Sequence, residues 1–185
     1  SSGAASSFYL PLGRVQRALE RLQAGLPITR GTLQTTFAYT PYDELGRLGL
    51  RPETEAAARK AAPELTGMLV VQDVLPGSPT EGQLLPGDIL VRVDGRPLTT
   101  FAPLADVLDS SVGRRITVEI ERGGERLDRQ LEVQDLHSIT PDQYLEFGDA
   151  VVHQLSYQMA RHLNSPVRGV FVANPGYALG AAGVP

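Results

Sequence analysis

The chain has 185 residues, 42% of them hydrophobic, which is enough for one domain or two small ones with a buried core. Its formal net charge of -4, without a basic stripe interleaved with aromatic residues, argues against a nucleic-acid interface. The absence of cysteine excludes disulfides, a thiol nucleophile and a thiolate metal site, and no apolar run is long enough to span a membrane.

The first elements are predicted from the spacing of apolar residues. Residues 6–12 form a short apolar run containing Pro11, which predicts a terminal or edge strand. Residues 13–25 place apolar side chains at helical spacing and stop at Gly25, which predicts a helix. Four further elements are predicted on the same grounds: a strand over 30–39 turned by Thr40-Pro41, a short helix over 42–50, a helix over 53–62 and a strand over 67–75.

The stretch "GQLLPGDILVRVDGRPL" (82–98) places a short strand between two tight turns. Residues 89–93 alternate in the period-2 pattern of a half-buried strand. Asp94-Gly95 tolerates the positive φ of a type I′ hairpin turn, and Pro97 limits the next strand to a short or edge strand. Asp88, in a Pro-Gly-Asp turn, is expected to accept hydrogen bonds from loop amides, so we interpret it as structural and not catalytic.

The rest of the chain predicts a helix, a hairpin and a repeat. A helix is expected over 101–111 and a hairpin over 114–133, turning at Gly123-Gly124. Residues 168–185 resemble 66–86, and the strand and helix expected within 151–166 repeat the order of 32–52. We therefore expect the chain to end inside a second copy of its own fold, and half a domain this small cannot cover its own apolar face.

These motifs carry a resemblance to a known family. The segments "RGTLQ", "GMLVVQDVLPGSP", "LLPGDILVRVDGRPLTTF" and "GRRITVEIERGGE" occur in the order of the circularly permuted PDZ domain of HtrA (DegP-type) trypsin-like serine proteases. "FYLPLGRVQRALERLQAGLPITRG" is similar to the end of such a protease domain, its last strand followed by a connecting helix. The two-PDZ arrangement resembles the double-length HtrA-type proteases of fungal nuclei and their bacterial relatives.

The resemblance implies an α+β fold: a PDZ domain, a small partly open β-barrel or sandwich capped by helices, followed by a partial second PDZ-like repeat. It assigns residues 1–29 to the C-terminal strand and linker helix of a protease domain, 30–137 to the PDZ domain and 138–185 to the first part of the second PDZ-like domain. Bacterial relatives imply the periplasm, and fungal relatives imply the nucleus.

The resemblance also implies a binding site for peptides or unfolded protein segments. A PDZ domain leaves one strand edge unpaired beside a helix, and an extended peptide adds there as a further strand. The expected binding residues lie on a groove strand, its carboxylate-binding loop and the helix opposite: Arg30, Gly31, Thr32, Leu33, Gln34, Thr35, Phe37, Phe101, Leu104, Ala105 and Leu108. Plain core packing is the alternative for the apolar ones, Leu104 in particular.

One position departs from the family pattern. Gln34 stands where the family often has a second glycine in the carboxylate-binding loop. Since glutamine tolerates positive φ poorly, the loop is expected to be reshaped and its capture of a carboxylate weakened.

Other chemistry finds little support in the sequence. His137, Ser138 and Asp142 are neighbours in a linker, whereas a catalytic triad is defined by its spatial arrangement. His153 and His162 lack the spacing of a metal pair, and the glycines at 176–183 lack the lysine of a phosphate loop. We therefore expect no cofactor, no metal and no catalysis by this chain itself.

Two classes of function remain open. One is the peptide-recognition part of a serine endopeptidase whose triad lies upstream of residue 1, with any homo-oligomer formed through that parent protease. The other is a stand-alone PDZ scaffold or adaptor with no protease function. The protease-like 6–29 segment favours the first.

Overall fold

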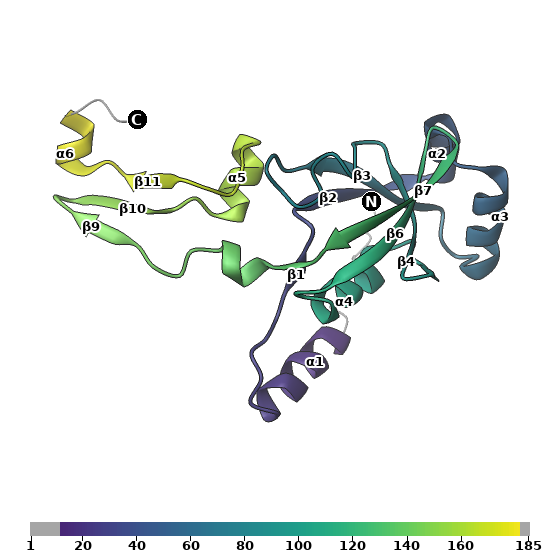
Figure 1. Ribbon diagram of the computed structural model, residues 1–185, viewed down its shortest axis with the longest axis horizontal. Helices are drawn as coiled ribbons and strands as arrows, with labels where there is room; N and C mark the ends of the chain where they lie inside the picture. The colour runs from purple at the N-terminus through teal and green to yellow at the C-terminus, as the bar shows by residue number, and fades with distance from the viewer. Residues whose placement is uncertain (1–11, 182–185) are drawn as a thin grey trace, which may run out of the picture.

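The computed structural model describes residues 12–181 (Figure 1). The strand expected over 6–12 lies outside the described residues except for Leu12, where helix α1 begins. The elements are α1 (Leu12–Gln23), β1 (Gly31–Thr32), β2 (Thr35–Pro41), α2 (Tyr42–Leu48), α3 (Pro52–Ala61), β3 (Gly67–Val74), β4 (Ile89–Val93), β5 (Arg96–Pro97), α4 (Phe101–Ser110), β6 (Arg115–Arg122), β7 (Glu125–Glu132), β8 (Gln134–Asp135), the 3-10 helix η1 (Leu136–Ile139), β9 (Leu145–Phe147), β10 (Ala150–Gln154), α5 (Tyr157–Leu163), β11 (Val170–Asn174) and α6 (Gly176–Ala181).

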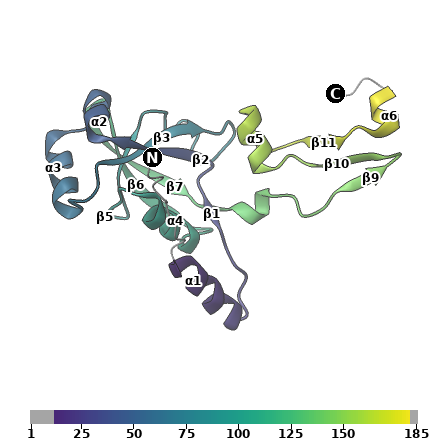
Figure 2. The ribbon, with the colours of Figure 1, turned by 180° about the vertical axis from the view of Figure 1, so that it is seen from behind.

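One antiparallel sheet of six strands organises the larger part of the molecule. Its order is β2-β3-β4-β6-β7, and β5 pairs with β4. Helices α2 and α3 lie together at one end of this sheet, while α4 lies below it (Figures 1 and 2). The short strands β1 and β8 pair with each other outside the sheet. The fold is therefore α+β with an open sheet, and the strands within 12–181 form no closed barrel.

Two apolar clusters hold this part together. The larger one joins the sheet to α4, with Leu90, Ile116 and Ile120 fully buried among its members. The smaller one joins α2 and α3 to the other side of the sheet through Leu45, Ala58 and neighbouring residues. Because α4 contributes to the larger cluster, its position relative to the strands is fixed by packing.

The stretch 82–98 folds as its sequence predicts. Asp94 and Gly95 both have positive φ and turn β4 into the two-residue β5. Asp88 is fully buried and accepts the Leu85 N–H (2.8 Å) as well as two hydrogen bonds from Arg122 (2.6 and 2.8 Å). The bond to Asp88 raises the pKa of Arg122. Asp88 is thus a structural loop residue, as expected, with an arginine partner that the sequence did not indicate.

The prediction of a single strand over 30–39 is wrong in one respect. It is divided into β1 and β2, because Gln34 has a φ of 51° and interrupts the extended backbone. After the break, β2 runs on to Pro41 and pairs with β3 along its whole length. A positive φ at a glutamine cannot be foreseen from residue preference.

The C-terminal part is a smaller unit at one side of the six-stranded sheet (Figure 1). Strands β10 and β11 and helix α5 confirm the predicted repeat, and β9, which the sequence analysis missed, pairs with β10. Tyr157 and Ala160 of α5 pack on Leu75, which follows β3. The unit thus rests on the first part of the chain through a few apolar contacts, while Val170 of β11 is 70% exposed.

Candidate functional site

The outer edge of β2 is free. Strand β2 ends the sheet order and pairs only with β3 among the described strands, so its other edge presents unpaired backbone groups. A bulge at Thr36–Phe37 bends this strand. Backbone N–H and C=O groups on a free edge can pair with another extended chain.

Phe37 on this strand and α4 belong to the same apolar cluster. Leu33, Leu104 and Leu108 are 2%, 4% and 8% exposed, so in this structure they lie in the core. Phe37 and Ala105 are half-buried, and Phe101 is 49% exposed. The structure therefore brings the two predicted walls together, and it leaves Phe37, Ala105 and Phe101 as the members that a ligand can reach without displacing core side chains. The assignment of these residues to a peptide groove stays a prediction.

The loop between β1 and β2 is held by internal hydrogen bonds. The Leu33 carbonyl accepts from the hydroxyls of Thr80 (2.9 Å) and Thr35 (3.3 Å). The Gln34 N–H donates to Thr32 Oγ1 (2.9 Å), and the Gln34 side chain donates to Gln134 beside β1. Glutamine thus adopts the positive φ at this position, where its buried side chain is anchored, and the loop is ordered by its own polar groups.

Alternation along this segment separates its N–H groups into two directions. Thr32 pairs with Gln134 of β8, and the Gln34 N–H donates back to Thr32 Oγ1. Gly31 faces α4, where its N–H donates to Asp109 Oδ1 (2.9 Å). In an extended segment Leu33 shares the direction of Gly31, and within residues 12–181 its N–H meets no acceptor. A backbone donor is therefore free next to a donor that already binds a carboxylate.

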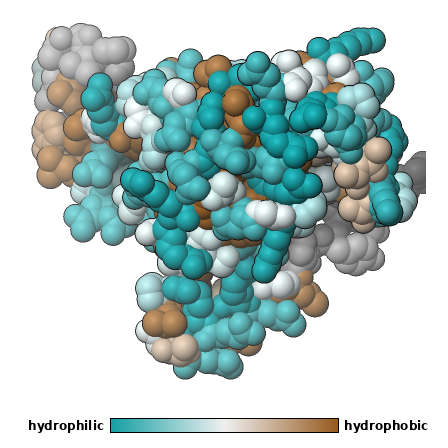
Figure 3. Space-filling view, turned by 45° about the vertical axis from the view of Figure 1, so that its right-hand side comes forward, coloured by the Kyte–Doolittle hydropathy of each residue, from teal (hydrophilic) through white to brown (hydrophobic). Residues whose placement is uncertain are grey.

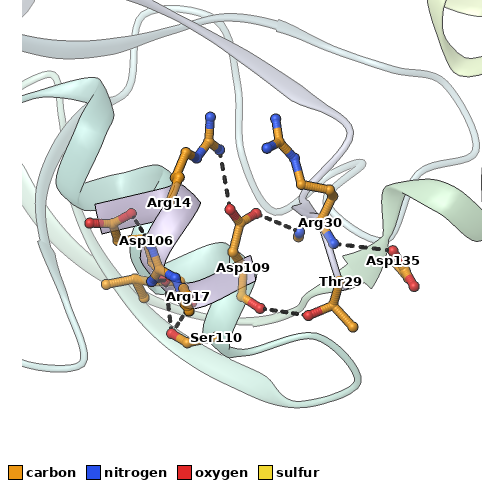
Figure 4. Close-up of polar contacts among 10 residues, drawn as sticks. Arg14, Arg17, Thr29, Arg30, Asp106, Asp109, Ser110 and Asp135 are labelled. Carbon is orange, nitrogen blue, oxygen red and sulfur yellow. Dashed lines mark hydrogen bonds and ion pairs between the residues drawn. The ribbon is translucent and has the colours of Figure 1, made fainter. Parts of the chain in front are cut away.

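Asp109 is a site residue that the sequence analysis missed (Figure 4). Its side chain is 8% exposed; Oδ1 accepts from Gly31, Oδ2 pairs with Arg14 (3.3 Å), and its backbone carbonyl accepts from Thr29 (3.1 Å). An acidic residue in the last turn of a helix is disfavoured by the helix dipole. That unfavourable position was the available signal that Asp109 must have partners elsewhere.

Polar contacts hold α1 against α4. Besides the Arg14–Asp109 pair, Arg17 pairs with Asp106 and also donates to the Asp106 carbonyl (3.2 Å). No residue of α1 is buried. Its apolar stripe, with Val15 and Leu19, is exposed, and brown side chains are visible on the lowest projection of the molecule, where α1 lies (Figure 3). Within residues 12–181, helix α1 is therefore attached to α4 by ion pairs and not by an apolar interface.

The described residues do not assemble the alternative catalytic or metal sites that the sequence analysis considered. The Ser138 hydroxyl donates to the Asp135 carbonyl (2.7 Å), and no contact joins it to the His137 ring among the described residues. Residues 12–181 contain no group of three or more histidine, aspartate or glutamate side chains placed to hold a metal ion. No described helix is both long enough and apolar enough to cross a membrane.

Comparisons with known proteins place the chain in context. The PDZ domain family matches residues 70–122, and a PDZ-like domain family matches residues 138–184. The chain is 51% identical over 195 aligned positions to Protease Do-like 7 of Arabidopsis thaliana, covering 100% of this chain and 18% of that protein. It is 48% identical over 172 positions to the pro-apoptotic serine protease nma111 of Aspergillus clavatus, covering 93% of this chain and 17% of that protein.

Among solved structures, the HtrA-type protease AlgW with decapeptide is similar with a TM-score of 0.47 and 21% sequence identity, over 66% of this chain and 33% of that chain. The chain spans less than a fifth of the length of the two relatives named above. The family matches confirm a PDZ fold followed by a second PDZ-like repeat. The boundaries at 29/30 and 137/138 stay predictions.

Proposed function

We propose that this chain, whose PDZ and PDZ-like matches occur in relatives named as proteases, recognises peptides for a serine endopeptidase by adding them as a strand to β2. The observation that carries the proposal is the outer edge of β2, which no other described strand occupies and which begins beside a Leu33 N–H that has no acceptor within 12–181. The ligands are extended peptides or unfolded protein segments, and any homo-oligomer would form through the parent protease.

The chemistry of strand addition fits the groups available at this edge. Main-chain hydrogen bonds to β2 supply affinity for any sequence, and side chains of the peptide that face α4 meet Phe37, Ala105 and Phe101. The Leu33 N–H supplies a donor for a terminal carboxylate. Ordering a flexible peptide costs entropy, so the dissociation constant should be on the order of micromolar.

The Gln34 departure does not by itself remove carboxylate recognition. Gln34 adopts the left-handed backbone conformation that a glycine would adopt freely, and its side chain is tied to Gln134. Because the loop is already ordered in the free protein, binding a peptide costs no further conformational entropy in the loop. We therefore propose peptides ending in an apolar residue with a free carboxylate as the preferred ligands.

The test is a backbone NMR titration with a peptide that ends in valine, as the free acid and as the C-terminal amide. Shifts concentrated at 31–37 and 101–108 are expected, with weaker binding of the amide. Ala105→Asp should weaken binding at least tenfold by placing a charge against apolar ligand side chains. Ala56→Asp, at an exposed position of α3, is the matched control and should bind as the wild type.

Two outcomes would contradict the proposal. If the resonances of 31–37 do not shift with any of a set of peptides that end in apolar residues, peptides do not bind at the edge of β2. Equal affinity for acid and amide would instead assign the ligands to internal segments. The stand-alone adaptor is favoured by no observation, since the relatives that match nearly the whole chain are named as proteases.

A further inference from the structure

Two backbone donors lie in a row at the end of the groove, and one of them already binds a carboxylate. The Gly31 N–H donates to Asp109 Oδ1, and the next N–H with the same direction, that of Leu33, is free among the described residues. At a rise of about 3.3 Å per residue, two such donors are separated by about 7 Å. A ligand carboxylate on Leu33 would therefore lie about 7 Å from the Asp109 carboxylate.

Two like charges at that separation repel each other. Asp109 is nearly buried, which limits screening by water, and its carboxylate lies at the negative end of α4. Arg14 of α1 is the one cation that pairs with Asp109 among the described residues. It cancels the charge that would otherwise oppose an anionic ligand end.

We propose that Arg14 is a specificity-determining residue: by neutralising Asp109, it permits the groove to prefer a free C-terminal carboxylate over a neutral peptide end. The inference rests on the proposed function, and it makes α1 part of the peptide site although α1 need not touch the peptide. A helix that precedes the PDZ domain thus sets which peptide ends the domain accepts. Because the contacts that hold α1 to α4 among the described residues are polar, any event that draws α1 away from α4 lowers this preference.

The size of the effect follows from Coulomb's law. At about 7 Å, one uncompensated charge changes affinity about threefold in bulk water and about fiftyfold at an effective dielectric constant of about 20. Arg14→Gln should therefore weaken binding of the free-acid peptide by a factor between about three and fifty. Binding of the amidated peptide should change less than about twofold.

The experiment measures the ratio of the acid and amide dissociation constants by isothermal titration calorimetry at low salt. Arg17→Gln is the matched control, since it also removes an α1–α4 ion pair and one positive charge but leaves Asp109 paired. Its ratio should equal that of the wild type. The double variant Arg14→Gln/Asp109→Asn should restore the ratio, because an asparagine oxygen can still accept from Gly31 without a charge to compensate. Added salt should reduce the difference between Arg14→Gln and wild type.

The outcomes separate this proposal from the proposed function. If the wild type binds neither peptide, strand addition is refuted and the role of Arg14 falls with it. If the wild type prefers the acid and Arg14→Gln keeps the same ratio, only the role of Arg14 is refuted. A loss in Arg17→Gln equal to that in Arg14→Gln would also overturn it, since attachment of α1 and not the charge on Asp109 would then be responsible.

Discussion

Gly31 occupies a point where no side chain fits. A Cβ atom built on it would lie 2.0 Å from the Leu108 carbonyl oxygen and 2.2 Å from the Leu108 carbonyl carbon, both backbone atoms of α4. Ordinary contact begins at 3.4 Å, so the C-terminal turn of α4 would have to move away from β1 by more than about 1 Å in Gly31→Ala. That displacement also separates the Gly31 N–H from Asp109.

The expected cost has two parts. Overpacking a fixed contact costs about 1–3 kcal/mol, and loss of a hydrogen bond to a charged acceptor costs about 1.5–3 kcal/mol. Gly31→Ala should therefore lower the free energy of unfolding by about 2.5–6 kcal/mol. Urea denaturation followed by far-ultraviolet circular dichroism measures it, since the chain has no tryptophan.

Gly46→Ala is the matched control for the same chemical change. Gly46 lies inside α2 with no atom within 4 Å of a built Cβ, so alanine should leave stability unchanged or raise it by up to about 1 kcal/mol. If Gly31→Ala unfolds within about 0.5 kcal/mol of the wild type, the close approach of β1 and α4 is not a feature of the protein in solution.

Three further predictions concern other parts of the chain. Asp88→Asn should lower the free energy of unfolding by about 2–4 kcal/mol, because Arg122 loses its buried ionic partner, whereas Asp128→Asn at an exposed position should not; equal effects would contradict this. Burial raises the pKa of Tyr42, so an ultraviolet pH titration should show a late phase of phenol ionisation, and Tyr42→Phe should remove that phase. The raised pKa means that Tyr42 contributes stability below the unfolded-state pKa, which is lost as pH rises through the folded-state value. Hydrogen exchange in dilute protein should be faster in β10 and β11 than in β3 and β4, since few apolar contacts hold the smaller unit; equal protection would make 150–181 a finished part of one domain.

Elements whose signal is local could be predicted from the amino-acid sequence. The alternation in 89–93, the Asp94-Gly95 and Gly123-Gly124 turns and the helical spacing of 101–111 each specify a structure within about ten residues, and the structure follows them. The order of these motifs was enough for the PDZ resemblance and for the second repeat.

The construction of the predicted site depends on contacts between residues that are far apart in the sequence. Gly31 and Asp109 are 78 residues apart in sequence; the helix-end position of Asp109 indicates that it needs partners, but not that these partners are Gly31 and Arg14. Gln34 likewise adopts a left-handed conformation that the preference of glutamine disfavours, and its side chain is anchored by Gln134, 100 positions away. Periodicity and turn residues reflect energies within one element, whereas a buried charge and a strained backbone are stabilised by whichever distant groups the completed fold brings beside them.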